Sequence, residues 1–272
     1  MSVLPSLRAE ITAATDRLMA TAADLGDADV TAPSALPGWS RGHVLTHLAR
    51  NADGLVNLLR WARTGIETPQ YPDPAARAAE IEEGAARRAA EHRADLELSA
   101  ARLATAIDEL PQPAWSAMVR ALRPPPHPAW YVLVRRVREL ELHHVDLRAG
   151  YTPDDWPEAF VLRELHDCLA CWPYGRSTIG AIVLEEPALE QPTREQPALE
   201  WRQLGEGPVV RGTARDVLAW LTGRSAGQRI RVVYEGQRAE GDRLPSPPPW
   251  LTMPAPANLP TAPPDTYPEE SP

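Results

Sequence analysis

The 272-residue chain contains no lysine, so all 28 of its basic residues are arginines, and its single phenylalanine is Phe160. Schiff-base catalysis, pyridoxal phosphate attachment and the phosphate-binding Walker A loop each need a lysine side chain. These classes of function are therefore excluded. The accompanying bias toward arginine, alanine and proline suggests a GC-rich coding genome, such as that of an actinobacterium.

The chain also lacks the long apolar run of a transmembrane helix, and its first ten residues, MSVLPSLRAE, do not have the pattern of a secretory signal peptide. We therefore expect a cytoplasmic protein with no membrane partner. The formal net charge of -9 is unfavourable for nucleic-acid binding, because phosphate backbones attract basic surfaces. A small molecule is the expected partner, and an acidic metabolite would require a local basic pocket.

Cysteine is scarce as well: Cys168 and Cys171 are the only two, and they form a CxxC motif. A redox dithiol of this kind normally stands at the start of a helix that follows a strand. The preceding residues, VLRELHD, already have a helical pattern. We therefore expect two small, partly buried helix residues, and a redox pair is the alternative.

Four segments have apolar residues at helical spacing, which predicts four long amphipathic helices. They cover Leu4 to Leu25, a stretch from an N-cap at Ser40 to about Thr64, a stretch from Asp73 to Leu110 with a break near Gly84, and Trp130 to Leu147. Helices of this length joined by loops predict a mainly α protein built on a four-helix bundle.

The pattern changes after residue 150. A predicted helix over 160–171 is followed by candidate strands over 198–204 and 229–236, on either side of a helix over 214–223. From Pro245 onward the chain carries 11 of its 30 prolines and few aliphatic residues, which predicts a mobile or extended segment that does not pack. The expected organisation is a helical bundle over 1–150, a small α+β domain over 157–243 and a proline-rich tail over 244–272.

Two helical segments, GHVLTHLARNAD and RVRELELHHVDL, place titratable side chains one turn apart. His43 and His47 share one helix face, and Glu139 and His143 share another. If the helices face each other, two imidazoles and one carboxylate converge, which is the ligand set of an open catalytic zinc site. The alternative is a pair of ordinary surface features: hydrogen-bonded histidines, and an ion pair between Glu139 and the neighbouring Arg136 and Arg138.

Two further residues of the second segment are weaker candidates. His144 is expected to point about 100° away from His143 around the helix, so it is not expected to be a ligand. Asp146 lies one turn from His143 and could orient its imidazole, although an exposed carboxylate at the helix end is the expected role.

The segment GWSRG, residues 38–42, matches the G-x-S-x-G nucleophile elbow of hydrolases. That motif requires an apolar strand immediately before it, whereas Ser-Ala-Leu-Pro precedes it here. Ser40 is therefore predicted to be the N-cap of the second helix, and a hydrolase is the minor alternative.

The segments PSALPGWSRGHVLTHLARNADGLVNLLRWARTG and RVRELELHHVDLRAGYTPDDWP resemble the mycothiol-dependent maleylpyruvate isomerases, which belong to the DinB-like metal-binding bundles. The likeness runs from the first helix to about Phe160, and the following region is similar to that family's C-terminal domain. The resemblance implies a divalent metal, most often Zn²⁺, held by His47, Glu139 and His143, with His43 as a neighbour.

The resemblance also implies that mycothiol, a low-molecular-weight thiol, binds zinc through sulfur and acts as a thiolate nucleophile. Addition to the cis double bond of maleylpyruvate, rotation and elimination would give the trans product, fumarylpyruvate. The family uses an arginine of its C-terminal domain at this site, and Arg224 in LAWLTGRSAG is the best match. A solvated arginine that complements the end of a helix is the alternative.

Three functions remain open from the sequence. The first is the isomerase, and the second is a mycothiol S-transferase that acts on a larger metabolite, for which the proline-rich segment WSAMVRALRPPPHPAW would shape a wider pocket. The third is a bundle without enzymatic activity that serves binding or regulation.

Overall fold

The computed structural model describes residues 2–185, 199–234, 244–250 and 255–268. The chain divides into two compact units. The first combines residues 1–152 with residues 253–272, and the second consists of residues 153–252.

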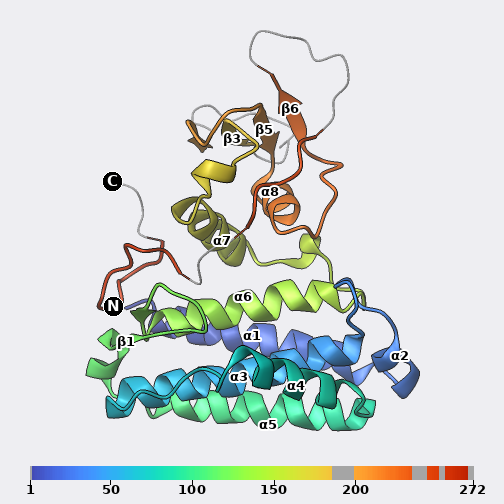
Figure 1. Ribbon diagram of the computed structural model, residues 1–272, viewed down its shortest axis with the longest axis vertical. Helices are drawn as coiled ribbons and strands as arrows, with labels where there is room; N and C mark the ends of the chain where they lie inside the picture. Colours follow the sequence, from blue (N-terminus) through green and yellow to red (C-terminus); the bar gives the residue numbers. More distant parts are fainter. Residues whose placement is uncertain (1, 186–198, 235–243, 251–254, 269–272) are drawn as a thin grey trace. The chain divides into compact units, whose positions relative to one another are not determined.

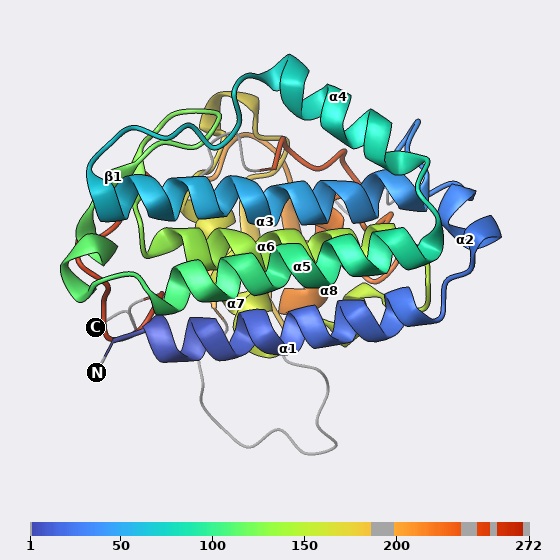
Figure 2. The same cartoon turned by 90° about the horizontal axis from the view of Figure 1, so that it is seen from below.

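Helices α1, α3, α5 and α6 form the bundle of the first unit, where they run side by side (Figures 1 and 2). This arrangement confirms the predicted mainly α fold with a four-helix bundle. The elements of the unit are α1 (Leu4–Ala23), α2 (Asp27–Thr31), α3 (Arg41–Thr64), α4 (Pro74–Ala85), α5 (Ala89–Asp108), the 3-10 helix η1 (Gln112–Ser116), the paired strands β1 (Met118–Val119) and β2 (His127–Pro128), and α6 (Tyr131–Asp146). Buried aliphatic and aromatic side chains fill the space between the helices and provide the main driving force for folding.

Helix α3 begins and ends where its sequence predicts. The hydroxyl of Ser40 accepts a hydrogen bond from the backbone N–H of His43, and the helix stops at Gly65, whose φ of 71° is the left-handed conformation that glycine favours. Ser40 is therefore a helix cap, as expected, and GWSRG does not form a nucleophile elbow.

The long third helix expected from the sequence is broken close to the predicted position. Helix α4 ends at Ala85, and α5 begins at Ala89. Two glycines let this turn approach α3 closely: a Cβ atom on Gly84 would lie 2.4 Å from the side chain of Thr46, and one on Gly42 would lie 2.4 Å from the carbonyl oxygen of Ala85. The approach fixes the C-terminal end of α4 beside the first turns of α3.

Helix α6 is buried on almost all sides, although charged residues make up much of its sequence. Arg135, Arg136 and Arg138 all have less than a tenth of their surface exposed. The alternative of a helix-surface ion pair of Glu139 with Arg136 and Arg138 is therefore wrong, because both arginines are buried. Buried charged groups need specific polar partners. Arg135 donates to Oε1 of Gln70, Arg136 to the carbonyl oxygen of Leu48, and Arg138 to the hydroxyl of Tyr131.

The second unit is a small sheet with helices. Its elements are the 3-10 helices η2 (Pro153–Asp155) and η3 (Tyr174–Arg176), helices α7 (Glu158–Ala170) and α8 (Ala214–Leu221), and strands β3 (Ala181–Leu184), β4 (Glu200–Trp201), β5 (Val209–Gly212) and β6 (Arg231–Val233). The strand order is β4-β3-β5-β6; β3 and β5 are parallel, and the outer pairs are antiparallel.

The α+β character of this unit and both of its helices were expected. The two predicted strands correspond to the edge strands β4 and β6, whereas the buried central strands β3 and β5 were missed. Residue 198 and residues 235–236 of the predicted strands lie outside the described residues. Cys168 and Cys171 are both buried at the end of α7, and the indole N–H of Trp250 donates to the sulfur of Cys168 over 2.8 Å.

Residues 255–268 of the proline-rich segment pack against the helical part of the first unit. The indole N–H of Trp130 donates to the carbonyl oxygen of Pro260 (2.9 Å), and the ring of Tyr267 contacts the rings of Trp130 and Tyr131. Ala255 is fully buried in the same cluster. The expectation of an unpacked tail is therefore wrong for residues 255–268. No helix in the described parts of the chain has the length and apolar character that crossing a bilayer requires.

Candidate metal centre

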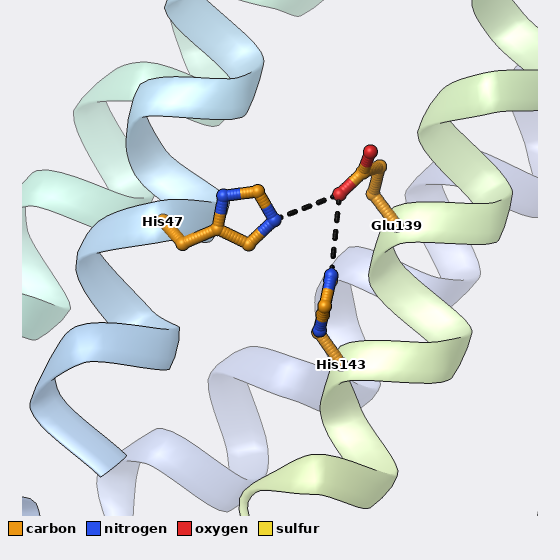
Figure 3. A group of neighbouring side chains, drawn as sticks. All are labelled: His47, Glu139 and His143. Carbon is orange, nitrogen blue, oxygen red and sulfur yellow. Dashed lines mark hydrogen bonds and ion pairs between the residues drawn. The ribbon is translucent and has the colours of Figure 1, made fainter. Parts of the chain in front are cut away.

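His47 from α3 and Glu139 and His143 from α6 point toward one another in the first unit (Figure 3). Oε2 of Glu139 lies 2.8 Å from Nε2 of His47 and 3.4 Å from Nε2 of His143. The three potential ligand atoms all lie within 4.8 Å of one another. The structure thus brings together the three residues that the sequence singled out, and their role as metal ligands stays a prediction.

The separations of the Glu139 oxygen from the two imidazoles can be compared with those of a tetrahedral metal site. Ligand atoms at about 2.0 to 2.1 Å in a tetrahedral zinc site stand about 3.3 Å apart, which lies between the 2.8 and 3.4 Å that separate the carboxylate oxygen from the two imidazoles. Two imidazoles and one carboxylate also match the donor set of catalytic zinc sites that keep an open position.

The protonation states of His47 and Glu139 favour a cation. Burial, together with the nearby His143, lowers the pKa of His47 to about 4, so its imidazole is neutral at pH 7. Although burial disfavours the charge of Glu139, hydrogen bonds from His143 and His47 hold the pKa of this carboxyl well below its usual value. The centre therefore presents a neutral imidazole and an anionic carboxylate.

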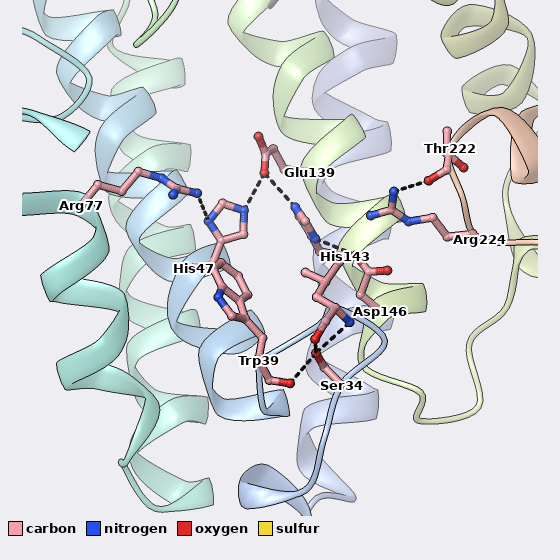
Figure 4. Close-up of polar contacts among 10 residues, drawn as sticks. Ser34, Trp39, His47, Arg77, Glu139, His143, Asp146, Thr222 and Arg224 are labelled. Atoms are coloured by element: carbon pink, nitrogen blue, oxygen red, sulfur yellow. Dashed lines mark hydrogen bonds and ion pairs between the residues drawn. The ribbon is translucent and has the colours of Figure 1, made fainter. Parts of the chain in front are cut away.

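Asp146 orients His143 from the opposite side. Its Oδ2 atom lies 2.8 Å from Nδ1 of His143, and its side chain is almost completely buried (Figure 4). The expectation of an exposed carboxylate at the end of the helix is therefore wrong. Although burial disfavours the charged imidazole, the hydrogen bonds to Asp146 and Glu139 raise the pKa of His143. A carboxylate behind a ligating histidine fixes its tautomer and makes it a stronger ligand.

Arg77 of α4 is a neighbour of the centre that the sequence analysis missed. Its Nη2 atom donates to Nδ1 of His47 over 3.0 Å (Figure 4). Its guanidinium also lies over the ring of Tyr71. Metal coordination through Nε2 of His47 requires the ring proton on Nδ1, so this hydrogen bond would then give way to another acceptor. The sequence contains one indirect signal for Arg77, the predicted helix break near Gly84. Because of this break α4 is a separate helix that packs against α3, and Arg77 on α4 can reach His47.

The other histidines of the two motifs lie outside the cluster. Nδ1 of His43 is 2.7 Å from the hydroxyl of Ser40, and its Nε2 is 3.2 Å from Glu82. His144 faces Thr21, 2.7 Å away, and stacks on the ring of Tyr151. His43 is therefore a neighbour of the centre and His144 points away from it, as expected.

Arg224 belongs to the second unit. It follows Gly223, whose φ is 74°, and its Nη1 atom donates to the carbonyl oxygen of Thr222 over 2.6 Å (Figure 4). This is the position expected for an arginine beyond the end of a helix. Its role toward a substrate stays a prediction.

The family model described as the mycothiol maleylpyruvate isomerase N-terminal domain matches residues 11–148. One solved structure, a mycothiol-dependent maleylpyruvate isomerase, has 29% sequence identity and a TM-score of 0.77. Another, described as a mutant of the mycothiol-dependent maleylpyruvate isomerase, has 28% identity and a TM-score of 0.76, and each alignment covers 91% of this chain and 97% of the other. No curated protein sequence matches the chain. The family match spans half of the chain and includes all three residues of the candidate centre, and the protein therefore belongs to the mycothiol maleylpyruvate isomerase family.

Proposed function

We propose that this protein is a metal-dependent and mycothiol-dependent isomerase that converts maleylpyruvate, or a similar cis-enoyl keto acid, to its trans isomer. The observation that supports this proposal is the convergence of His47, Glu139 and His143 within the domain that matches the family. The likeness to solved isomerase structures over nearly their whole length supports the same reaction.

His47, Glu139 and His143 would hold the ion, and Asp146 would hold His143 in the orientation that ligation needs. A bound zinc ion would supply a Lewis acid that favours the thiolate form of a coordinating thiol at neutral pH. The neutral state of His47 and the anionic state of Glu139 mean that these two ligands need not lose a proton at pH 7.

Arg77 is suited to bind a carboxylate of the substrate. Its guanidinium already lies within hydrogen-bond distance of His47, so it borders the centre directly. The planar fork of an arginine matches the two oxygens of a carboxylate, and a keto acid offers such groups. We assign to Arg77 the role of positioning the substrate next to the centre, and to Arg224 the stabilisation of developing negative charge.

The proposal is tested with the purified full-length chain loaded with zinc. Isomerisation of maleylpyruvate should require both zinc and mycothiol, and His47→Ala should abolish both zinc retention and activity. His43→Ala is the matched control, because His43 lies one turn earlier on α3 and contacts Ser40 and Glu82 instead of the cluster.

Each outcome of this assay has a defined meaning. Turnover that depends on zinc and mycothiol supports the isomerase. If the protein holds zinc but does not isomerise maleylpyruvate, and mycothiol is consumed in a reaction with an electrophilic metabolite, the isomerase proposal is wrong and the S-transferase takes its place. If the wild-type protein binds no zinc, and His47→Ala changes neither zinc content nor turnover, the protein is a binding protein without catalytic activity.

A further inference from the structure

A cavity lies between α1 and α5 of the bundle. Its volume is about 270 Å³, several times the roughly 30 Å³ that one water molecule occupies in the liquid. Figure 2 shows α1 and α5 side by side, with α6 behind them. Residues of all three helices line the cavity, and the contribution of α6 is Arg136.

Arg136 is a buried cation whose hydrogen bonds leave one edge unused. Only 2% of its surface is exposed. Nη1 donates to the carbonyl oxygen of Leu48 and to Oδ1 of Asn51, both at 2.9 Å. Its Nε atom is buried and has no acceptor among the described residues. An unmade hydrogen bond of a buried charged group is costly, so a further acceptor on the cavity side of Arg136 would stabilise the guanidinium.

Asp53 and Glu139, the two carboxylates that raise the pKa of Arg136 through their charge, have other partners. Asp53 pairs with Arg50 and Arg102 at 3.1 and 2.7 Å, and Glu139 contacts the two histidines of the candidate metal centre. Burial lowers the pKa of Arg136 to about 10, so the guanidinium is still charged at pH 7. Among the described residues, Arg136 forms no ion pair with a carboxylate, so the guanidinium that lines the cavity keeps its positive charge unpaired.

The walls of the cavity are mainly apolar. Ile11 of α1 and Leu103 and Ile107 of α5 line it together with alanines of α5. Two acidic residues at the exposed edge, Asp16 and Asp108, disfavour a second negative charge there, although Arg8 pairs with Asp108. The arrangement suits a ligand with one anionic end, placed deep, and an uncharged apolar body.

We propose that this cavity is a binding site for a monocarboxylate with a short apolar body, whose carboxylate pairs with Arg136 while its hydrocarbon part packs between α1 and α5. A guanidinium edge binds a carboxylate with charge-assisted hydrogen bonds, and removal of apolar surface from water supplies the remainder of the affinity. The site is separate from the three metal-ligand side chains and needs no metal.

The test is calorimetric titration of the full-length protein with hexanoate and with hexanamide, its uncharged analogue. We expect saturable binding of one hexanoate per chain and at least tenfold weaker binding of hexanamide. Arg136→Met removes the charge while keeping a long side chain, and should weaken hexanoate binding at least tenfold. Ala104→Leu fills the cavity from α5 without altering Arg136 and should have the same effect, whereas Ala94→Leu on the same helix should not.

Binding at the metal centre is distinguished by the variant His47→Ala. Hexanoate should bind this variant with the affinity of the wild type, because the cavity does not depend on the ion. Loss of binding in His47→Ala, equal affinity for hexanoate and hexanamide, or unchanged binding in Ala104→Leu would each overturn the proposal. Ala104→Leu keeps the test valid even if Arg136→Met fails to fold, since Ala104 is exposed.

Discussion

Replacing Asp146 by asparagine should weaken zinc binding without removing any ligand. Asp146 is almost completely buried and lies 2.8 Å from Nδ1 of His143. Asparagine keeps the shape and one acceptor oxygen but loses the charge that strengthens the imidazole as a ligand. Loss of such a supporting group typically costs about tenfold to a hundredfold in metal affinity. This corresponds to about 1.4 to 2.7 kcal/mol of binding free energy.

The affinity is measured by competition for zinc between the protein and a chromophoric chelator at pH 7.5. Asp24→Asn is the control, because Asp24 is an exposed residue at the end of α1. Thermal unfolding of the metal-free proteins separates an effect on the fold from an effect on the site. A zinc affinity for Asp146→Asn within twofold of the wild type would refute the idea that this carboxylate supports a ligating histidine.

Four further predictions follow from the structure. Glu139→Ala should lose zinc and activity but keep its helical circular dichroism, because the ligand serves the centre and the apolar core holds the bundle; stoichiometric zinc in this variant would contradict the assignment. Arg77→Met should raise the KM for maleylpyruvate at least tenfold with unchanged zinc content, as judged by steady-state kinetics and metal analysis. Gly42→Ala should destabilise the protein by about 1 to 3 kcal/mol in urea unfolding, because its Cβ would meet a backbone oxygen, whereas Gly175→Ala, with open space around it, should be tolerated. Burial lowers the pKa of His127 to about 3 in the folded protein, so between about pH 6.5 and pH 3 only the unfolded chain binds a proton at this residue. The free energy of unfolding should therefore fall on acidification through this window by up to about 1.4 kcal/mol per pH unit. The fall should be less steep in His127→Gln, which has no imidazole to protonate.

The helices of the bundle could be predicted because their signals are local. Apolar residues at helical spacing marked the segments, and Ser40 and the break near Gly84 marked boundaries that depend on a few neighbouring residues. The facing positions of His47, Glu139 and His143 followed from helix geometry once the two helices were assumed to pack together.

Features that depend on distant parts of the chain could not be predicted in the same way. The arginines of α6 suggested an exposed face, but their partners are supplied by other segments, such as the carbonyl oxygen of Leu48 for Arg136. Strands β3 and β5 are only four residues long, too short for a periodic pattern to distinguish a strand from a buried helix segment.

Amino-acid composition also failed to predict the packing of residues 255–268. Proline has little conformational freedom to lose on folding, so a proline-rich segment can pack when a few side chains such as Tyr267 find partners. Composition alone predicted no packing, because the surface that receives this segment is formed by residues more than a hundred positions earlier in the sequence.

Because the final residues return to the bundle, the second unit is a domain inserted into the sequence of the first. One proteolytic cut near residue 152 would not release the inserted unit, because the fragment that contains it would still be held to the bundle through residues 255–268. A cut near residue 252 would likewise leave the inserted unit joined covalently to the chain that follows α6. Two cleavages are therefore required to release it, and a shortened chain that ends at residue 252 would expose the indole of Trp130 to solvent.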